Sequence, residues 1–164
     1  MDPVFAWIED SALSVWMRES ESLLAFPGVL TLHAIGLAFA VGTSAAIDLR
    51  VIGFLQGVPV AAMARFMPVF WFGFAVNAVS GFLLLIAYPT KALTNPLFYF
   101  KLSCIGAAVA MLVVIRRRVL AAPEPERVLD SARGFAVASL GLWAAAIAAG
   151  RLLAYTYGRL LVSF

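Results

Sequence analysis

Residues 68–88, with the sequence PVFWFGFAVNAVSGFLLLIAY, decide the fold of this chain. The segment is apolar and carries no charged side chain. Its length matches the about 20 residues that an α-helix needs to cross the hydrocarbon core of a bilayer. It lacks the alternation of polar and apolar residues that is typical of membrane β-barrel strands. The segment therefore predicts a transmembrane helix.

The rest of the chain repeats this pattern. Of its 164 residues, 63% are hydrophobic and 13% are charged, and the mean hydropathy is +0.97. A soluble domain of this size could not cover so much apolar surface with polar groups. Candidate spans lie at about 22–47, 68–88, 96–115 and 132–157. We expect an all-α integral membrane four-helix bundle, with residues 1–164 forming a single transmembrane domain.

The segments outside the spans carry their own signals. Residues 4–18 mix apolar and acidic side chains and predict a short N-terminal interfacial helix; a soluble turn is the alternative. Met1-Asp2-Pro3 lacks the basic start of a cleavable signal peptide, so we expect the first span to stay as an anchor. Helix one can continue past Asp48 toward Leu55, where Gln56-Gly57-Val58-Pro59 breaks it. Asn95-Pro96 predicts the start of the third span. The stretch 121–127, which carries Pro123 and Pro125, predicts a polar loop.

The basic residues predict an orientation. Those in the loops after the first and third spans are Arg50, Arg65, Arg116, Arg117, Arg118, Arg127 and Arg133. The positive-inside rule places this set in the cytoplasm and both termini outside. The net charge of +3 then reports orientation, and we expect the bilayer, not nucleic acid, as a partner.

Four polar residues inside the spans fall into two layers. Counting 1.5 Å per residue places His33 roughly 16 Å below the outer surface, and Asn77 at about the same level. Lys101 and Arg151 share a layer roughly 8–9 Å deep. Polar side chains are costly in hydrocarbon, so these four are the candidate site residues.

His33 has two interpretations. It is either a neutral imidazole that forms a hydrogen bond with Asn77, or an axial ligand to the iron of haem b. The chain has one histidine, so a second ligand would be a methionine or His33 of a second copy in a homodimer. Met111, Met63 and Met67 are poor candidates because they should lie toward the cytoplasm.

The cationic layer has two interpretations as well. Lys101 and Arg151 could hold the haem propionates, a lipid phosphate or a carboxylate by charge-assisted hydrogen bonds. They could instead extend to the headgroups as long cationic chains near helix ends do.

The remaining polar residues in the spans carry weaker signals. Asp48 and Arg50 should point to different sides of a helix. We expect Asp48 to pair with a cationic residue near the cytoplasmic edge, such as one of Arg116–Arg118; a proton relay is the alternative. We expect Cys104 to fill space as a small apolar side chain. The sequence lacks the ligands of a closed zinc or copper site. Small-residue stripes predict close helix packing or room for a flat cofactor. These stripes are Gly36/Ala40/Ser44, Gly73/Asn77/Gly81 and Gly141/Ala145/Ala149.

Several short motifs carry a resemblance. They are Leu32-His33-x-x-Gly36, Asp48-Leu49-Arg50, Ser80-Gly81, Asn95-Pro96-x-Phe98-x-x-Lys101 and Gly150-Arg151-x-x-Ala154-Tyr155. On these pieces, the chain resembles a family of short bacterial inner-membrane proteins of about this length. The resemblance implies a multi-pass protein of the bacterial inner membrane, with Tyr155 as a further polar candidate, and it brings no activity with it.

A looser likeness points to a function. The Leu-His-x-x-Gly pattern and the early lysine are similar to those of copper-resistance-protein-D-like and protoporphyrinogen-oxidase-like membrane bundles. Haem-linked redox work in the second group favours a small redox subunit that holds haem b, or interacts with quinone, at His33. It would exchange electrons with a periplasmic partner. The alternative is a non-enzymatic transport, lipid-binding or scaffold subunit whose Lys101/Arg151 layer binds an anion.

Overall fold

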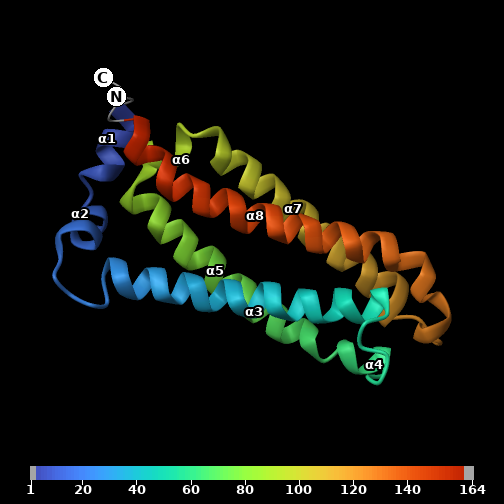
Figure 1. The fold of residues 1–164 in the computed structure, drawn as a ribbon. Helices are drawn as coiled ribbons and strands as arrows, with labels where there is room; N and C mark the ends of the chain where they lie inside the picture. Colours follow the sequence, from blue (N-terminus) through green and yellow to red (C-terminus); the bar gives the residue numbers. More distant parts are fainter. Residues whose placement is uncertain (1–2, 161–164) are drawn as a thin grey trace.

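The computed structural model describes residues 3–160, with side chains as far as Tyr155, so the two termini lie outside the described residues. Every regular element in this part is helical (Figure 1). The bundle is formed by four long helices: α3 (Phe26–Ile52), α5 (Phe66–Ala87), α7 (Pro96–Ile115) and α8 (Arg133–Leu160). The predicted all-α bundle is thereby confirmed.

Four helical stretches are long and apolar enough to cross a membrane. They are Phe26–Ile52, Val60–Ala87, Pro96–Leu120 and Pro125–Tyr155. In the most apolar 18 residues of each stretch, at most 28% of the residues are buried inside the protein. Such a surface suits a lipid environment, where apolar side chains face outward at no cost. Each stretch exceeds the about 20 residues that a bilayer core requires, so its polar ends extend beyond that core.

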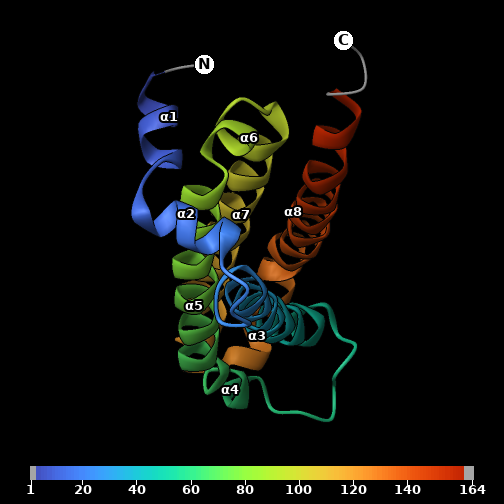
Figure 2. The same cartoon turned by 90° about the vertical axis from the view of Figure 1, so that its left-hand side faces the viewer.

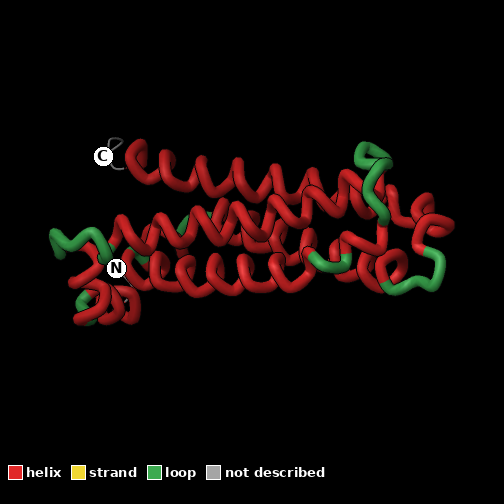
Figure 3. Tube along the Cα trace, turned by 90° about the horizontal axis from the view of Figure 1, so that it is seen from below, coloured by secondary structure: helices red, strands yellow, loops and turns green. Residues whose placement is uncertain are grey.

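The bundle has two ends with different contents (Figures 1 and 3). We name the first the α6 end, which holds α1 (Pro3–Glu9), α2 (Ala12–Glu19) and α6 (Pro89–Leu93). The opposite α4 end holds α4 (Val60–Met63), the π-helical turn η1 (Arg116–Leu120) and the 3-10 helix η2 (Pro125–Ala132). The seven loop arginines of the predicted cytoplasmic set lie in η1 and η2 or at the adjoining ends of α3, α5 and α8.

The long helices pack as two pairs. α3 packs along α5, α7 packs along α8, and α3 also contacts α8. Figures 1 and 2 show α3 and α8 lying close together toward the α4 end and diverging toward the α6 end. The two halves of the bundle therefore offer different environments, one closely packed and one spread apart.

Local signals set the helix ends. The Asn95 side chain caps α7 by accepting a hydrogen bond from the Leu97 N–H at 3.0 Å, with Pro96 in the first turn, as the sequence predicts. α3 runs to Ile52, past the expected limit of its span, and ends at Gly53. There φ is +113°, a conformation that glycine adopts without strain.

Two expectations about the connecting segments were wrong in detail. The N-terminal segment forms two short helices, not one, because Ser11 interrupts it and caps α2 through the Ser14 N–H. The loop before the fourth span contains a 3-10 helix, η2, which begins at Pro125 and leads directly into α8. The prolines that suggested a loop allow this helix, since proline is compatible with a first helical turn.

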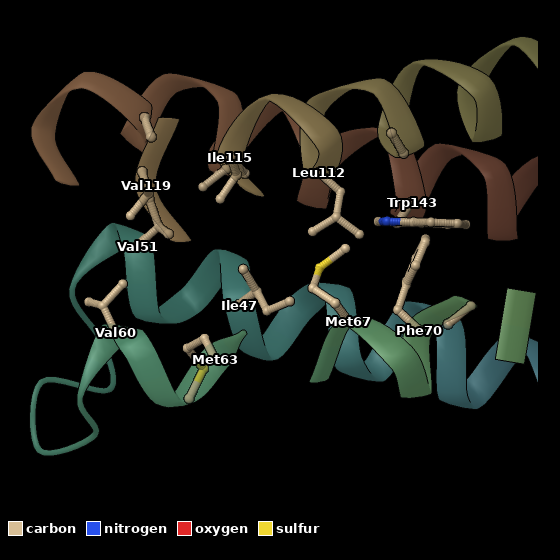
Figure 4. Close-up of a cluster of buried hydrophobic side chains, with 14 residues drawn as sticks. Ile47, Val51, Val60, Met63, Met67, Phe70, Leu112, Ile115, Val119 and Trp143 are labelled. Atoms are coloured by element: carbon tan, nitrogen blue, oxygen red, sulfur yellow. The ribbon is translucent and has the colours of Figure 1, made fainter. Parts of the chain in front are cut away.

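The main hydrophobic core lies in the α4 half, where all four long helices meet. Figure 4 shows Ile47 of α3, Phe70 of α5, Leu112 of α7 and Trp143 of α8 converging there. A smaller cluster at the α6 end joins Met17 of α2 to α3 and α5. The core therefore closes one half of the bundle more fully than the other.

Candidate functional site

A backbone contact between α3 and α5 positions the predicted site. A Cβ atom on Gly36 would lie 2.6 Å from the Asn77 backbone nitrogen and 2.9 Å from the Gly73 carbonyl oxygen. A Cβ atom on Gly73 would lie 2.6 Å from the Cβ of Phe39. These separations are shorter than van der Waals contact, so only glycine allows this approach. The predicted stripes on α3 and α5 thus bring the two backbones together.

Directly beside this contact, His33 of α3 bonds to α5. Its Nδ1 lies 3.0 Å from the Asn77 carbonyl oxygen and 3.1 Å from the Ser80 Oγ. The Asn77 side-chain amide donates to the His33 carbonyl oxygen at 2.8 Å. The ring lies over Gly81, where a Cβ atom would be 3.0 Å from the imidazole Cε1. The structure therefore brings His33 and Asn77 together, and adds Ser80 to them.

The hydrogen-bond network around His33 favours one tautomer of its ring. The Ser80 hydroxyl donates to the Val76 carbonyl oxygen at 2.6 Å, so its lone pairs can accept a bond from the imidazole. The Asn77 carbonyl oxygen can only accept. Two acceptors therefore face Nδ1. The one donor near it, the Asn77 side-chain amide at 3.3 Å, forms its shorter hydrogen bond with the His33 carbonyl oxygen at 2.8 Å, so the balance of contacts favours a proton on Nδ1. The opposite nitrogen, Nε2, then carries a lone pair, and it forms no hydrogen bond within residues 3–155.

Lys101 and Arg151 differ in their surroundings. Lys101 of α7 is half-buried, and its charge lies within electrostatic range of His33. The side chain of Lys101 lies beside Gly150 of α8. Its Cδ and Cε atoms are 3.8 and 3.9 Å from the position that a Cβ atom on Gly150 would take. Arg151, the next residue of α8, is exposed. Of the two cations, Lys101 is the one that the structure brings toward the imidazole.

The prediction that Asp48 pairs with the arginines after α7 was wrong. Asp48 is 0% exposed, and its Oδ2 accepts a hydrogen bond from the Ser44 hydroxyl at 3.4 Å. Arg116, Arg117 and Arg118 are exposed on η1. Asp48 faces α8 in the interior of the bundle, whereas long cationic side chains on an exposed turn stay in contact with water.

An ion pair that the sequence did not predict joins Arg50 to η2. Arg50 is 5% exposed, and its Nη2 donates to both carboxylate oxygens of Glu126, at 2.9 and 2.8 Å. The same guanidinium donates to the Val58 carbonyl oxygen. The Val60 N–H donates to Glu126 at 3.0 Å. That bond, together with Arg50, lowers the pKa of the Glu126 carboxyl group below its usual value.

The other candidates stay apart from this site. Tyr155 is exposed on α8, and Cys104 is a buried apolar filler with a free thiol. The stripe of small residues on α8 does not pack closely against another helix along its whole length, since a Cβ on Gly141 would meet nothing within 4 Å. Within the described residues, no group of three or more His, Cys, Asp or Glu side chains could hold a metal ion.

These features define a class of protein: a helical bundle with four stretches able to cross a membrane and a polar histidine cluster between two of its helices. Compared with family models, with curated proteins and with solved structures, the chain gives no significant match. The family resemblance of its motifs therefore stays a prediction.

Proposed function

We propose that this chain is a small redox subunit of the bacterial inner membrane in which His33 binds haem b or interacts with quinone. The observation that carries the proposal is the fixed imidazole. Nδ1 lies 3.0 Å from the Asn77 carbonyl oxygen, and with the proton on Nδ1 this arrangement leaves the Nε2 lone pair for a ligand. A histidine that binds a metal commonly donates its other ring N–H to a carbonyl oxygen in this way.

The described residues fit haem better than a protein-only metal site. A porphyrin supplies four nitrogen ligands, so a single imidazole suffices on the protein side. Bound haem would supply one-electron transfer. Lys101 lies within electrostatic range of His33, where a cation can hold a propionate, and Arg151 would act at the edge of the bundle.

Met63 and Met67 lie too far from His33 to supply a second protein ligand. Met63 and Met67 belong to the core in the α4 half, together with Ile47. Ile47 lies about 21 Å along α3 from His33 at 1.5 Å per residue. His33 would then hold haem as the single protein ligand, or together with His33 of a second copy in a homodimer.

The orientation follows from the arginines at the α4 end. The positive-inside rule places that end in the cytoplasm, and both termini and the site in the periplasmic half of the membrane. A redox partner would then exchange electrons from the periplasmic side. The quinone version uses the same atoms, because an unprotonated Nε2 accepts a hydrogen bond from a hydroquinone hydroxyl group.

Haem reconstitution tests the proposal. The protein, purified in mild detergent with a tag that contains no histidine, is titrated with haem while the Soret band is recorded. We expect wild-type protein to bind haem and His33→Ala to lose the band. Lys101→Gln should weaken binding about 10- to 100-fold, since a hydrogen bond to a charged group contributes about 1.5–3 kcal/mol. Lys91→Gln is the matched control. Absence of a Soret band in the wild type would refute the haem version.

A second candidate function is supported by the exposure of Arg151. An exposed cation on α8, near half-buried Lys101, suits an anionic lipid headgroup or a carboxylate. The chain would then be a lipid-binding, transport or scaffold subunit. In that case Arg151→Ala should reduce the co-purification of anionic lipid while His33→Ala has no effect. The opposite pattern would count against this function.

A further inference from the structure

A polar cluster lies inside the main hydrophobic core, at the contact between α3 and α8. Ser44 and Asp48 come from α3, and Ser139 and Trp143 come from α8. Ser44, Asp48 and Ser139 are 0% exposed, and Trp143 is 3% exposed. Figure 4 shows Trp143 in the core that also holds Ile47. An acidic group is therefore enclosed by apolar side chains.

The hydrogen bonds of this cluster are incomplete. The Trp143 Nε1–H donates to the Ser44 Oγ at 3.1 Å, and the Ser44 hydroxyl donates to Asp48 Oδ2 at 3.4 Å. Ser139 faces the Asp48 carboxyl group closely enough to interact with it. Even so, Asp48 Oδ1 and Ser139 Oγ form no regular hydrogen bond with any described residue. Two neighbouring buried oxygen atoms are thus without a regular hydrogen-bond partner, although the Ser139 hydroxyl can both donate and accept.

No described cation compensates a negative charge on Asp48. Arg50, two residues further along α3, forms its ion pair with Glu126. Arg133, at the start of α8, pairs with Asp130. The arginines of η1 are exposed. An ionised carboxylate that is buried without a cation and with one long hydrogen bond is strongly unfavourable.

We propose that Asp48 and Ser139 form an internal proton-binding site, in which Asp48 holds a proton on Oδ1 at neutral pH and donates it to the Ser139 Oγ. A single proton gives both unpaired oxygen atoms a partner and removes the charge. The Oδ2 atom continues to accept from Ser44. The site is independent of His33, which lies about 22 Å away along α3 at 1.5 Å per residue.

A bound sodium ion is the competing occupant. A hard cation of this kind takes about six oxygen ligands, as Ca²⁺ and Mg²⁺ do. The cluster offers the side-chain oxygens of Ser44, Asp48 and Ser139, and the Ser44 hydroxyl is engaged with Trp143 and Asp48. A proton needs one donor and one acceptor, and the cluster provides both.

Infrared spectroscopy of the full chain in detergent at neutral pH tests the proposal. We expect the C=O stretching band of a protonated carboxyl group in wild-type protein. Asp48→Asn should remove this band, and the matched variant Asp130→Asn, in which an exposed acid is replaced, should keep it. Absence of the band in the wild type, or its persistence in Asp48→Asn, would overturn the proposal.

Two further measurements keep the proposal falsifiable if Asp48→Asn does not fold. Ser139→Ala keeps the acid and removes its acceptor, so the band should shift in frequency; an unchanged frequency contradicts the role of Ser139. Sodium chloride is then compared with choline chloride in thermal unfolding of the wild type. We expect equal melting temperatures, and a rise specific to sodium would overturn proton binding in favour of the cation.

Discussion

Replacing Gly36 with alanine tests the backbone contact that holds His33 against α5. The new Cβ atom would lie 2.6 Å from the Asn77 backbone nitrogen, whereas non-bonded heavy atoms require about 3.5 Å. The helices must therefore separate by about 0.9 Å at this point. The hydrogen bond from the Asn77 amide to the His33 carbonyl oxygen, 2.8 Å long, would stretch to about 3.7 Å and be lost.

The loss of stability follows from these distances. Overpacking of a tight contact costs about 1–3 kcal/mol, and the lost interhelical hydrogen bond about 1 kcal/mol more. Alanine also gains about 1 kcal/mol over glycine in helix propensity. Gly42→Ala, in the same helix, shares that gain and meets nothing within 4 Å. We therefore expect Gly36→Ala to be less stable than Gly42→Ala by about 2–4 kcal/mol.

The assay is equilibrium unfolding of both variants in mixed micelles, with helix content followed by circular dichroism. The slope of the transition should be the same in both variants, because the unfolded states are equivalent. If Gly36→Ala proves as stable as Gly42→Ala, the close α3–α5 contact is refuted, and with it the fixed position of His33.

Three further changes have definite outcomes. Asn77→Leu should lower the free energy of unfolding by about 1 kcal/mol, measured in the same micelles, because its interhelical hydrogen bonds are lost. Gly81→Ala should reduce haem binding in the Soret titration, since its Cβ would lie 3.0 Å from the His33 ring. The lowered pKa of Glu126 stabilises the fold above the ordinary value of 4.5, and this contribution is lost as the pH falls through the lowered pKa. Melting temperatures should therefore fall less with acidification in Glu126→Gln than in the wild type. The control is Glu124→Gln, which removes only an exposed ion pair and should behave as the wild type does. Equal falls in all three proteins would contradict this role of Glu126.

The sequence predicts the helices because their signals are local. Apolar length locates the four long helices, and Asn95-Pro96 locates a helix start, since a cap and a fixed φ act within a few residues. Depth counting also works for His33 and Asn77, because helical rise is constant and the two helices are antiparallel neighbours. The same counting places Lys101 one layer outward of His33, and its charge lies within electrostatic range of His33.

The sequence does not predict contacts that depend on how helices rotate and cross. Asp48 and Arg50 sit close in sequence, but one faces Ser139 and the other faces Glu126, in a loop that is distant along the chain. Ser80 belongs to one of the sequence motifs, but its bond to His33 depends on the side of α5 on which it lies.

The single histidine allows one direct measurement of the central claim, that Nδ1 of His33 holds the proton and Nε2 is free for a ligand. Protein labelled with ¹⁵N-histidine and purified through a tag without histidine gives side-chain nitrogen signals from His33 alone. We expect a protonated Nδ1 and an unprotonated Nε2 in a neutral ring, with the Nε2 signal altered when haem is added. A proton on Nε2, or an Nε2 signal that haem leaves unchanged, would contradict the proposed haem site.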